Sequence, residues 1–244
     1  MKKVVLFSML GMLFFNSVHA QSLDSFFDQF DQFLTSYTEK GYIDFDRLKA
    51  DPGLLNELYE TIGKVDLKGQ DEVVTKAFLI NAYNLLVIKQ EQVFYPIKSP
   101  LEIDGFFSSI VHQVAGKEYT LDALEKEYLL KQYPDARVHL VLVCGAKGCP
   151  KLFEKAYRPE TLDQQIDDQV KNILNDPDFL IVSDDKTNIA LSEIFKWYQQ
   201  DFIQQNTDVL DYINQYRTEK LSKESVVSYY EYDWSINTIS KDDD

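Results

Sequence analysis

The sequence predicts an α+β fold, in which a long apolar central helix packs with other helices against a small mixed or antiparallel sheet. Three observations indicate this class. Several stretches carry apolar residues at helical spacing, the segments of strand character are short and scattered, and 45% of the 244 residues are hydrophobic. With 27% charged residues beside them, this composition is typical of a globular protein with a packed core.

Residues 1–20 have the pattern of a cleaved secretory signal. Two lysines precede an apolar run over residues 4–15, and Val18 and Ala20 place small side chains at positions −3 and −1 before a cleavage site. The apolar run is shorter than the about 20 residues that a membrane-spanning helix needs. We therefore expect an exported chain, periplasmic or secreted, with no membrane span in its mature part.

The remainder of the chain is predicted to form a single globular domain over residues 21–239. No linker rich in Pro, Gly or Ser divides this stretch, and no internal repeat of fixed period is present. Residues 240–244 carry three aspartates and lack apolar side chains that could anchor them. We expect these last residues to be a disordered acidic tail.

Two amphipathic helices are predicted at the start of the domain. Apolar residues recur every three or four positions from Leu23 to Leu34, which indicates a helix that faces the core and ends near Gly41. Pro52 is tolerated in the first turn of a second helix, which carries apolar residues as far as Ile62. Each helix should bury one face against the core.

The longest predicted helix covers about residues 72–94. Its interior, residues 77–88, is apolar nearly all round, which indicates a helix at the centre of the fold. Asn81 and Asn84 lie one turn apart within it and must find hydrogen-bond partners in the core. Both are candidate site residues, Asn81 as an orienting group of a catalytic site and Asn84 as a binding group.

A buried strand is predicted to deliver a polar loop. A hairpin around Gly116 leads into a helix that Thr120 caps and that covers residues 121–130. The run over residues 138–143 is β-branched and almost wholly apolar, a pattern typical of a strand buried on both faces. The loop over residues 144–150 follows this strand directly and contains both cysteines of the chain.

The C-terminal part alternates between helices and extended segments. Thr161 begins a capping box for one helix, Ser192 caps another that reaches Phe202, and a hairpin over residues 179–191 lies between them. Two further helical stretches and an extended piece over residues 232–237 complete the prediction.

The charge and the missing motifs exclude several classes of function. A formal net charge of −15 argues against a nucleic-acid partner. The glycine spacings of phosphate-binding loops, the nucleophile elbow of serine hydrolases and the calcium-loop pattern do not occur. A metal site is not favoured, because the cysteines and histidines come from separate elements. We predict no cofactor and no metal, and a small molecule or peptide as the partner.

The two cysteines, Cys144 and Cys149, allow two interpretations. In an oxidising compartment they form a disulfide that staples the loop of a non-catalytic binding module. Alternatively, Cys144 is the nucleophile of a thiol-dependent acyl or amide hydrolase or transferase, and the Gly145 amide helps to bind the oxyanion. Both interpretations place the loop at the functional site.

Four further residues complete the candidate site. Glu125 lies on the core side of its helix and His139 lies in the predicted strand, and either could orient a catalytic group. On a straight strand His139 and Cys144 point to opposite faces with Cα atoms about 16 Å apart, so they could not form a dyad. Trp197 and Tyr198 are candidate binding residues beside a cavity.

Several segments, in this order, resemble the domain of unknown function 547 family, here in an exported, bacterial-type form. The matching segments are residues 77–84, 121–125, 137–145 with Cys149 and Pro150, 191–202 and 232–234. The resemblance covers roughly residues 40–237 and implies no reaction, because the family name establishes no activity. Family members usually carry a histidine directly after Glu125, where this chain has Lys126, an ammonium that would need a strongly depressed pKa to act as a base.

Overall fold

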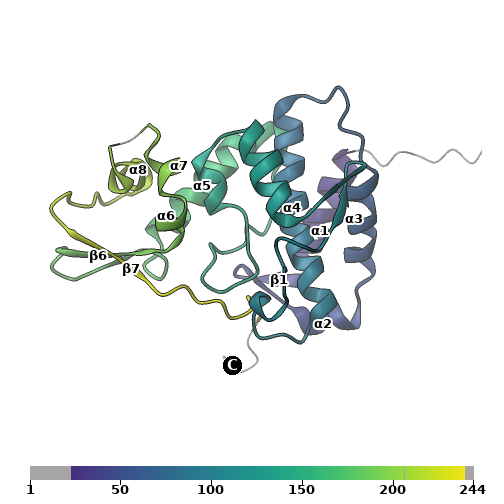
Figure 1. Cartoon of the computed structure of the whole chain (residues 1–244), viewed down its shortest axis with the longest axis horizontal. Coiled ribbons are helices and arrows are strands. Elements are labelled where there is room, and N and C mark those ends of the chain that lie inside the picture. Colours follow the sequence, from purple (N-terminus) through teal and green to yellow (C-terminus); the bar gives the residue numbers. More distant parts are fainter. Residues whose placement is uncertain (1–22, 206, 240–244) are drawn as a thin grey trace, which may run out of the picture.

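A layer of helices forms the N-terminal half of the protein. This computed structural model describes residues 23–205 and 207–239, and the helices of this half pack together at one end of the molecule (Figure 1). They are α1 (Leu23–Tyr37), α2 (Phe45–Ala50), α3 (Gly53–Lys64) and α4 (Glu72–Phe94), with a hairpin of β1 (Thr38–Glu39) and β2 (Tyr42–Ile43) between α1 and α2. The three predicted helices are confirmed, whereas the sequence patterns anticipate neither α2 nor this hairpin.

The central position of α4 follows from its composition. Every side chain from Ala77 to Ile88 is buried, so the middle turns of the helix have no exposed face. The ring of Phe26 on α1 packs on Phe78 of α4 at a centroid distance of 5.4 Å, and α3 packs on both helices. α4 is therefore a rigid support for the loops that pack on its remaining sides.

The predicted strand over residues 138–143 is wrong. Residues Ala136–Leu140 form a 3-10 helix, although all six side chains of the run are buried as expected. Asn84 of α4 takes the place of a neighbouring strand. Its side-chain amide donates to the Val141 carbonyl at 3.0 Å, and its oxygen accepts from the Val143 amide at 2.9 Å. One side chain thus satisfies backbone groups that a β-ladder would otherwise satisfy.

The C-terminal half combines helices with a three-stranded mixed sheet (Figure 1). Its elements are α5 (Leu162–Asn175), β5 (Ile181–Val182), β6 (Asn188–Ser192), α6 (Ile194–Trp197), α7 (Gln199–Ile203), α8 (Val209–Tyr216) and β7 (Val226–Tyr230). β5 and β6 form the predicted antiparallel hairpin, and β7 joins β6 in parallel, with Ile189 opposite Val227. Two helical stretches are expected in the last part of the chain, and the second of them is wrong. Residues Val226–Tyr230 form the strand β7 instead, because they pair with the edge of β6, a contact that no local sequence pattern indicates.

A hairpin leads into an unusual helix. β3 (His112–Val114) and β4 (Lys117–Tyr119) form the predicted hairpin, and the Thr120 hydroxyl accepts a hydrogen bond of 3.2 Å from a backbone amide of the next helix. That helix has π geometry over Ala123–Leu130. π turns are rare and occur often at functional sites. This π-helix carries Glu125 on its buried side.

An extended segment, residues 231–239, returns from the sheet toward the helical half (Figure 1). We call this segment the strap and residues 144–149 the cysteine loop. Backbone hydrogen bonds of 2.8 Å join the strap to the cysteine loop at Gly145 and at Gly148. The strap therefore places its own side chains beside both cysteines.

Two predictions concern residues outside the described part of the chain, namely the signal over residues 1–20 and the tail over residues 240–244. Within the described ranges, no helix is both long and apolar enough to cross a membrane.

Candidate functional site

Most of the predicted site residues gather around one cavity of about 270 Å³. The cavity lies between the π-helix, α6, the cysteine loop and the strap. Six predicted residues line it: Glu125, His139, Cys144, Cys149, Trp197 and Tyr198. These residues come from separate parts of the chain, and the fold brings them together. We call this space the aromatic cavity.

The two cysteines form one wall of the aromatic cavity. Their sulfurs lie 2.26 Å apart, at disulfide distance, and their Cα atoms lie 6.2 Å apart. The Cys144 amide donates to the Cys149 sulfur at 2.8 Å. The Tyr232 hydroxyl of the strap lies 3.0 Å from the Cys144 sulfur and 3.1 Å from the Cys149 sulfur. Burial raises the pKa of Tyr232, so its hydroxyl keeps the proton that it donates to sulfur.

Glu125 is a buried carboxyl that forms no ion pair with a lysine or arginine of the described residues. Its two oxygens accept hydrogen bonds from the hydroxyls of Tyr83 at 3.3 Å and Tyr198 at 3.2 Å. Burial raises the pKa of Glu125, and the charge of Lys126 and these two hydroxyls offset the shift only in part. The Lys126 ammonium itself lies 2.7 Å from Asp122 in an exposed ion pair. Lys126 is thus held in an ion pair and is a poor substitute for a catalytic base.

His139 connects the cavity to a neighbouring groove. Its side chain is fully buried, its ring stacks on Tyr198 at a centroid distance of 3.8 Å, and its Nε2 lies 2.7 Å from a carboxylate oxygen of Asp201. Nδ1 lies 4.0 Å from Glu125 and has no hydrogen-bond partner within the described residues. Burial lowers the pKa of His139, although Asp201 opposes the shift, so the neutral imidazole is favoured near neutral pH.

The expectation that His139 and Cys144 point to opposite faces of a strand is wrong, because no strand forms there. Both side chains line the same cavity. They nevertheless form no dyad, since one imidazole nitrogen faces Asp201 and the other has no hydrogen-bond partner in the described chain. The described residues also contain no group of three or more His, Cys, Asp or Glu side chains arranged to hold a metal ion.

Three predicted site residues lie outside the lining of the aromatic cavity. The side-chain NH₂ of Asn81 donates hydrogen bonds to the backbone carbonyls of Ala77 and Tyr157 at 2.7 and 2.8 Å. Its side-chain oxygen accepts a hydrogen bond from the backbone amide of Tyr157 at 2.9 Å. Asn84 holds the backbone ahead of the cysteine loop. Gly145 is buried in the loop, and its carbonyl accepts a hydrogen bond from the strap. The structure therefore gives these residues supporting contacts rather than a place in the cavity wall.

Sequence reasoning missed much of the aromatic lining. Tyr83 of α4, Tyr232 and Trp234 of the strap, and Phe107 also face the cavity. The ring of Tyr232 lies 4.9 Å from those of Trp197 and Trp234, measured between centroids. Residues 232–234 are among the segments that carry the family resemblance, and that was the one signal that could have indicated a site role for them.

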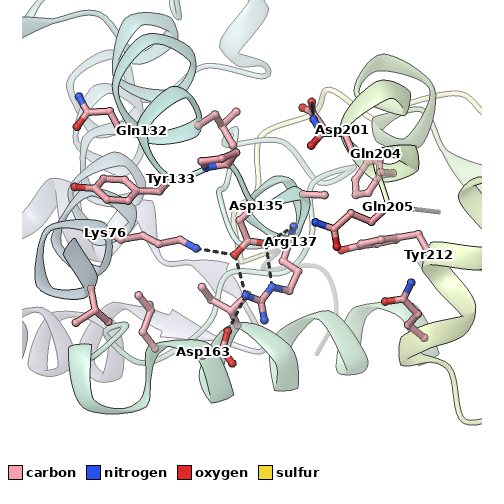
Figure 2. A pocket seen from close by; sticks show the side chains of 18 of the residues that line it. Lys76, Gln132, Tyr133, Asp135, Arg137, Asp163, Asp201, Gln204, Gln205 and Tyr212 are labelled. Carbon is pink, nitrogen blue, oxygen red and sulfur yellow. Dashed lines mark hydrogen bonds and ion pairs between the residues drawn. The ribbon is translucent and has the colours of Figure 1, made fainter.

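A larger groove of about 850 Å³ lies beside α5, α7 and α8. Four of its charged side chains pair with one another: Figure 2 shows Lys76 paired with Asp135, and Asp135 and Asp163 paired with Arg137. Burial raises the pKa of Asp135, but Arg137 and Lys76 outweigh this effect and lower the pKa to about 2. This network of ion pairs is typical of residues that hold elements of the fold together. The groove is therefore a weaker candidate for a ligand site than the aromatic cavity.

The fold and the cavity define the class of the protein, a helix-rich α+β domain whose aromatic and acidic cavity is walled by a cysteine pair. Residues 67–174 match the model of the family described as "Protein of unknown function, DUF547". The matched segment contains α4, the π-helix and the cysteine loop. α6 and the strap lie beyond the matched range. Comparison with curated proteins and with solved structures gave no match.

Proposed function

We propose that the chain is a binding protein whose aromatic cavity takes up a small molecule or one side chain of a peptide, without chemistry at sulfur. The disulfide between Cys144 and Cys149 carries this proposal, because a cysteine in a disulfide has no thiolate to act as a nucleophile. The pair instead holds one wall of the cavity in place. Export to an oxidising compartment, which the signal pattern predicts, would preserve the disulfide.

The lining of the cavity supports binding. Ligand sites are concave, mostly apolar and aromatic, and contain a few placed polar groups, with typical volumes of about 300 to 1,000 Å³. The aromatic cavity has this composition, and its volume of about 270 Å³ is just below that range. Trp197 contributes to the lining and is 46% exposed, so a ligand can reach it from solvent. A small ligand, or one group of a larger one, fits best.

A second candidate function is a thiol-dependent acyl or amide hydrolase or transferase. It is favoured by the presence of Cys144, His139 and Glu125 in one cavity. A thiol reductant would first have to convert the disulfide into two thiols. His139 would then have to turn toward Cys144 and accept its proton before the thiolate could attack a carbonyl carbon and displace an amine or alcohol. The hydrogen bond between His139 and Asp201 opposes this movement.

Thiol counting distinguishes the two functions. We expect no alkylation of the native, unreduced protein by iodoacetamide, and two modified cysteines after reduction with dithiothreitol, as measured by mass spectrometry. The physical reason is that both sulfurs share one bond. Cys144 that reacts rapidly without reduction would refute the binding proposal and favour the enzyme.

The binding function is tested directly by ligand-observed NMR with a mixture of neutral and charged small fragments. We expect at least one fragment to bind the native protein and to lose binding in the Trp197→Ala variant, because the indole forms part of the cavity wall. Leu101→Ala is the control, since Leu101 is another exposed apolar residue and lies outside the cavity. Binding that both variants retain, or no binding at all, would contradict the proposal.

A further inference from the structure

We propose that the ligand of the aromatic cavity carries an ammonium group, which lies among the aromatic rings and against the carboxyl of Glu125. This inference rests on the proposed binding function and names the chemical class of the ligand. The shared chemistry is an alkylammonium cation, which a small free amine or the side chain of a peptide lysine could supply.

The charges that line the cavity support a cationic ligand. Asp122 and Glu125 are acidic, and no lysine or arginine is among the lining residues. Asp122 already has a counter-charge, since it forms an ion pair with Lys126 at 2.7 Å. Among the described residues Glu125 forms no ion pair with a lysine or arginine: its hydrogen-bond partners are two neutral tyrosine hydroxyls, and the nearest basic nitrogen recorded is His139 Nδ1 at 4.0 Å.

A buried carboxylate without a counter-ion is unfavourable, and the protein itself does not correct this at Glu125. The Glu125 side chain is only 10% exposed, so water compensates its charge poorly. An ammonium ligand would supply the missing positive charge at this position. The larger groove differs in this respect, because Lys76 and Arg137 neutralise the half-buried carboxylate of Asp135 from within the chain.

The aromatic rings add a second attraction. Trp197 and Trp234 are tilted by 53° and 54° against Tyr232 and by only 26° against each other, so the Tyr232 ring stands at an angle to two nearly parallel indoles. Aromatic faces attract cations, and tryptophan does so most strongly. Several rings together with one carboxylate form the type of site that recognises alkylammonium groups. The net charge of −15 would also draw cations toward the protein.

The chain offers a direct optical probe of this cavity. Trp197 and Trp234 are its only two tryptophans, and both line the cavity, so the intrinsic tryptophan emission reports on this site alone. We would titrate the full-length disulfide-bonded protein with choline and with its neutral isostere 3,3-dimethyl-1-butanol. Nα-acetyl-lysine methylamide would serve as a third probe that represents a peptide lysine.

We expect choline or the lysine derivative to change the emission and to bind at least about ten-fold more tightly than the neutral alcohol. The better of these two cations identifies the source of the ammonium group. Glu125→Gln should weaken binding of that cation by at least about ten-fold and leave the alcohol unaffected, because the amide keeps the shape and removes the charge. Glu127→Gln is the matched control, since Glu127 lies on the same π-helix but is exposed and paired with Lys131.

The failure of this inference can be distinguished from failure of the proposed function. Equal affinity for choline, the lysine derivative and the alcohol would overturn the cation inference and leave the cavity a binding site. The absence of an emission change with all three probes would also overturn it, and the NMR fragment screen would then decide whether the cavity binds anything. If Glu125→Gln does not fold, the comparison of the cations with the isosteric alcohol on the native protein still decides the question.

Discussion

Replacing Gly145 with alanine is expected to lower the free energy of unfolding by roughly 2 to 5 kcal/mol. Two effects add at this position. The backbone has a φ of +81°, which side chains other than glycine adopt at a cost. An added Cβ would also lie 2.2 Å from a carboxyl oxygen of Glu91, whose side chain is fully buried and cannot move into solvent. Urea unfolding measures the change.

Gly116→Ala is the matched control for this prediction. Gly116 also has a positive φ, +74°, but an added Cβ there meets nothing within 4 Å. This variant should lose only the backbone contribution, about 1 to 2 kcal/mol. Equal losses in the two variants would mean that Glu91 does not pack against the cysteine loop.

The glycine that follows Cys144 shows why a residue type alone does not define a catalytic role. A glycine after a cysteine at the end of a predicted strand suggested an oxyanion hole. In the structure Gly145 lies outside the cavity lining, and its missing side chain gives room to the carboxyl of Glu91. The requirement for glycine is therefore explained by packing on α4.

Local patterns predicted the helices well and one buried segment badly. The apolar run in α4 and the hairpin around Gly116 form where the sequence predicts them, because each depends on periodicity or on turn residues close in the chain. Residues 138–143 are buried as predicted but are not a strand. Their β-branched composition indicates burial, whereas the choice of conformation depends on Asn84, which is more than fifty residues away in the sequence.

The site could be predicted in part. Cys144, Glu125 and His139 were found by residue type, and the fold brings them to one cavity. Tyr232 and Trp234 were missed because their position depends on the strap, which returns from β7 to the cysteine loop through long-range backbone hydrogen bonds. No local spacing in the sequence indicates that the strap returns to the cysteine loop. The aromatic lining of the cavity could therefore be recognised only in the folded protein.

Glu91→Gln is expected to stabilise the protein by an amount that grows as the pH rises. The Glu91 side chain is fully buried, and neither carboxyl oxygen has a hydrogen-bond partner within the described residues. Burial raises its pKa well above the ordinary value of 4.5. The unfolded chain releases this proton near the ordinary pKa, whereas the folded chain keeps it to higher pH. Between these two pKa values the folded state binds more protons, so rising pH favours unfolding by up to about 1.4 kcal/mol per pH unit.

Glutamine removes this titration while it keeps the shape that packs beneath Gly145. Urea unfolding of the native protein and of Glu91→Gln, from acid to neutral pH, measures the difference in stability between them. Glu125, whose pKa burial also raises, is present in both proteins, so its contribution cancels in that difference. Glu127→Gln is the matched control, because it makes the same substitution at an exposed glutamate. A constant difference for Glu91→Gln would mean that the Glu91 carboxylate ionises in the folded protein without cost, which is incompatible with an unpaired carboxyl enclosed between α4 and the cysteine loop.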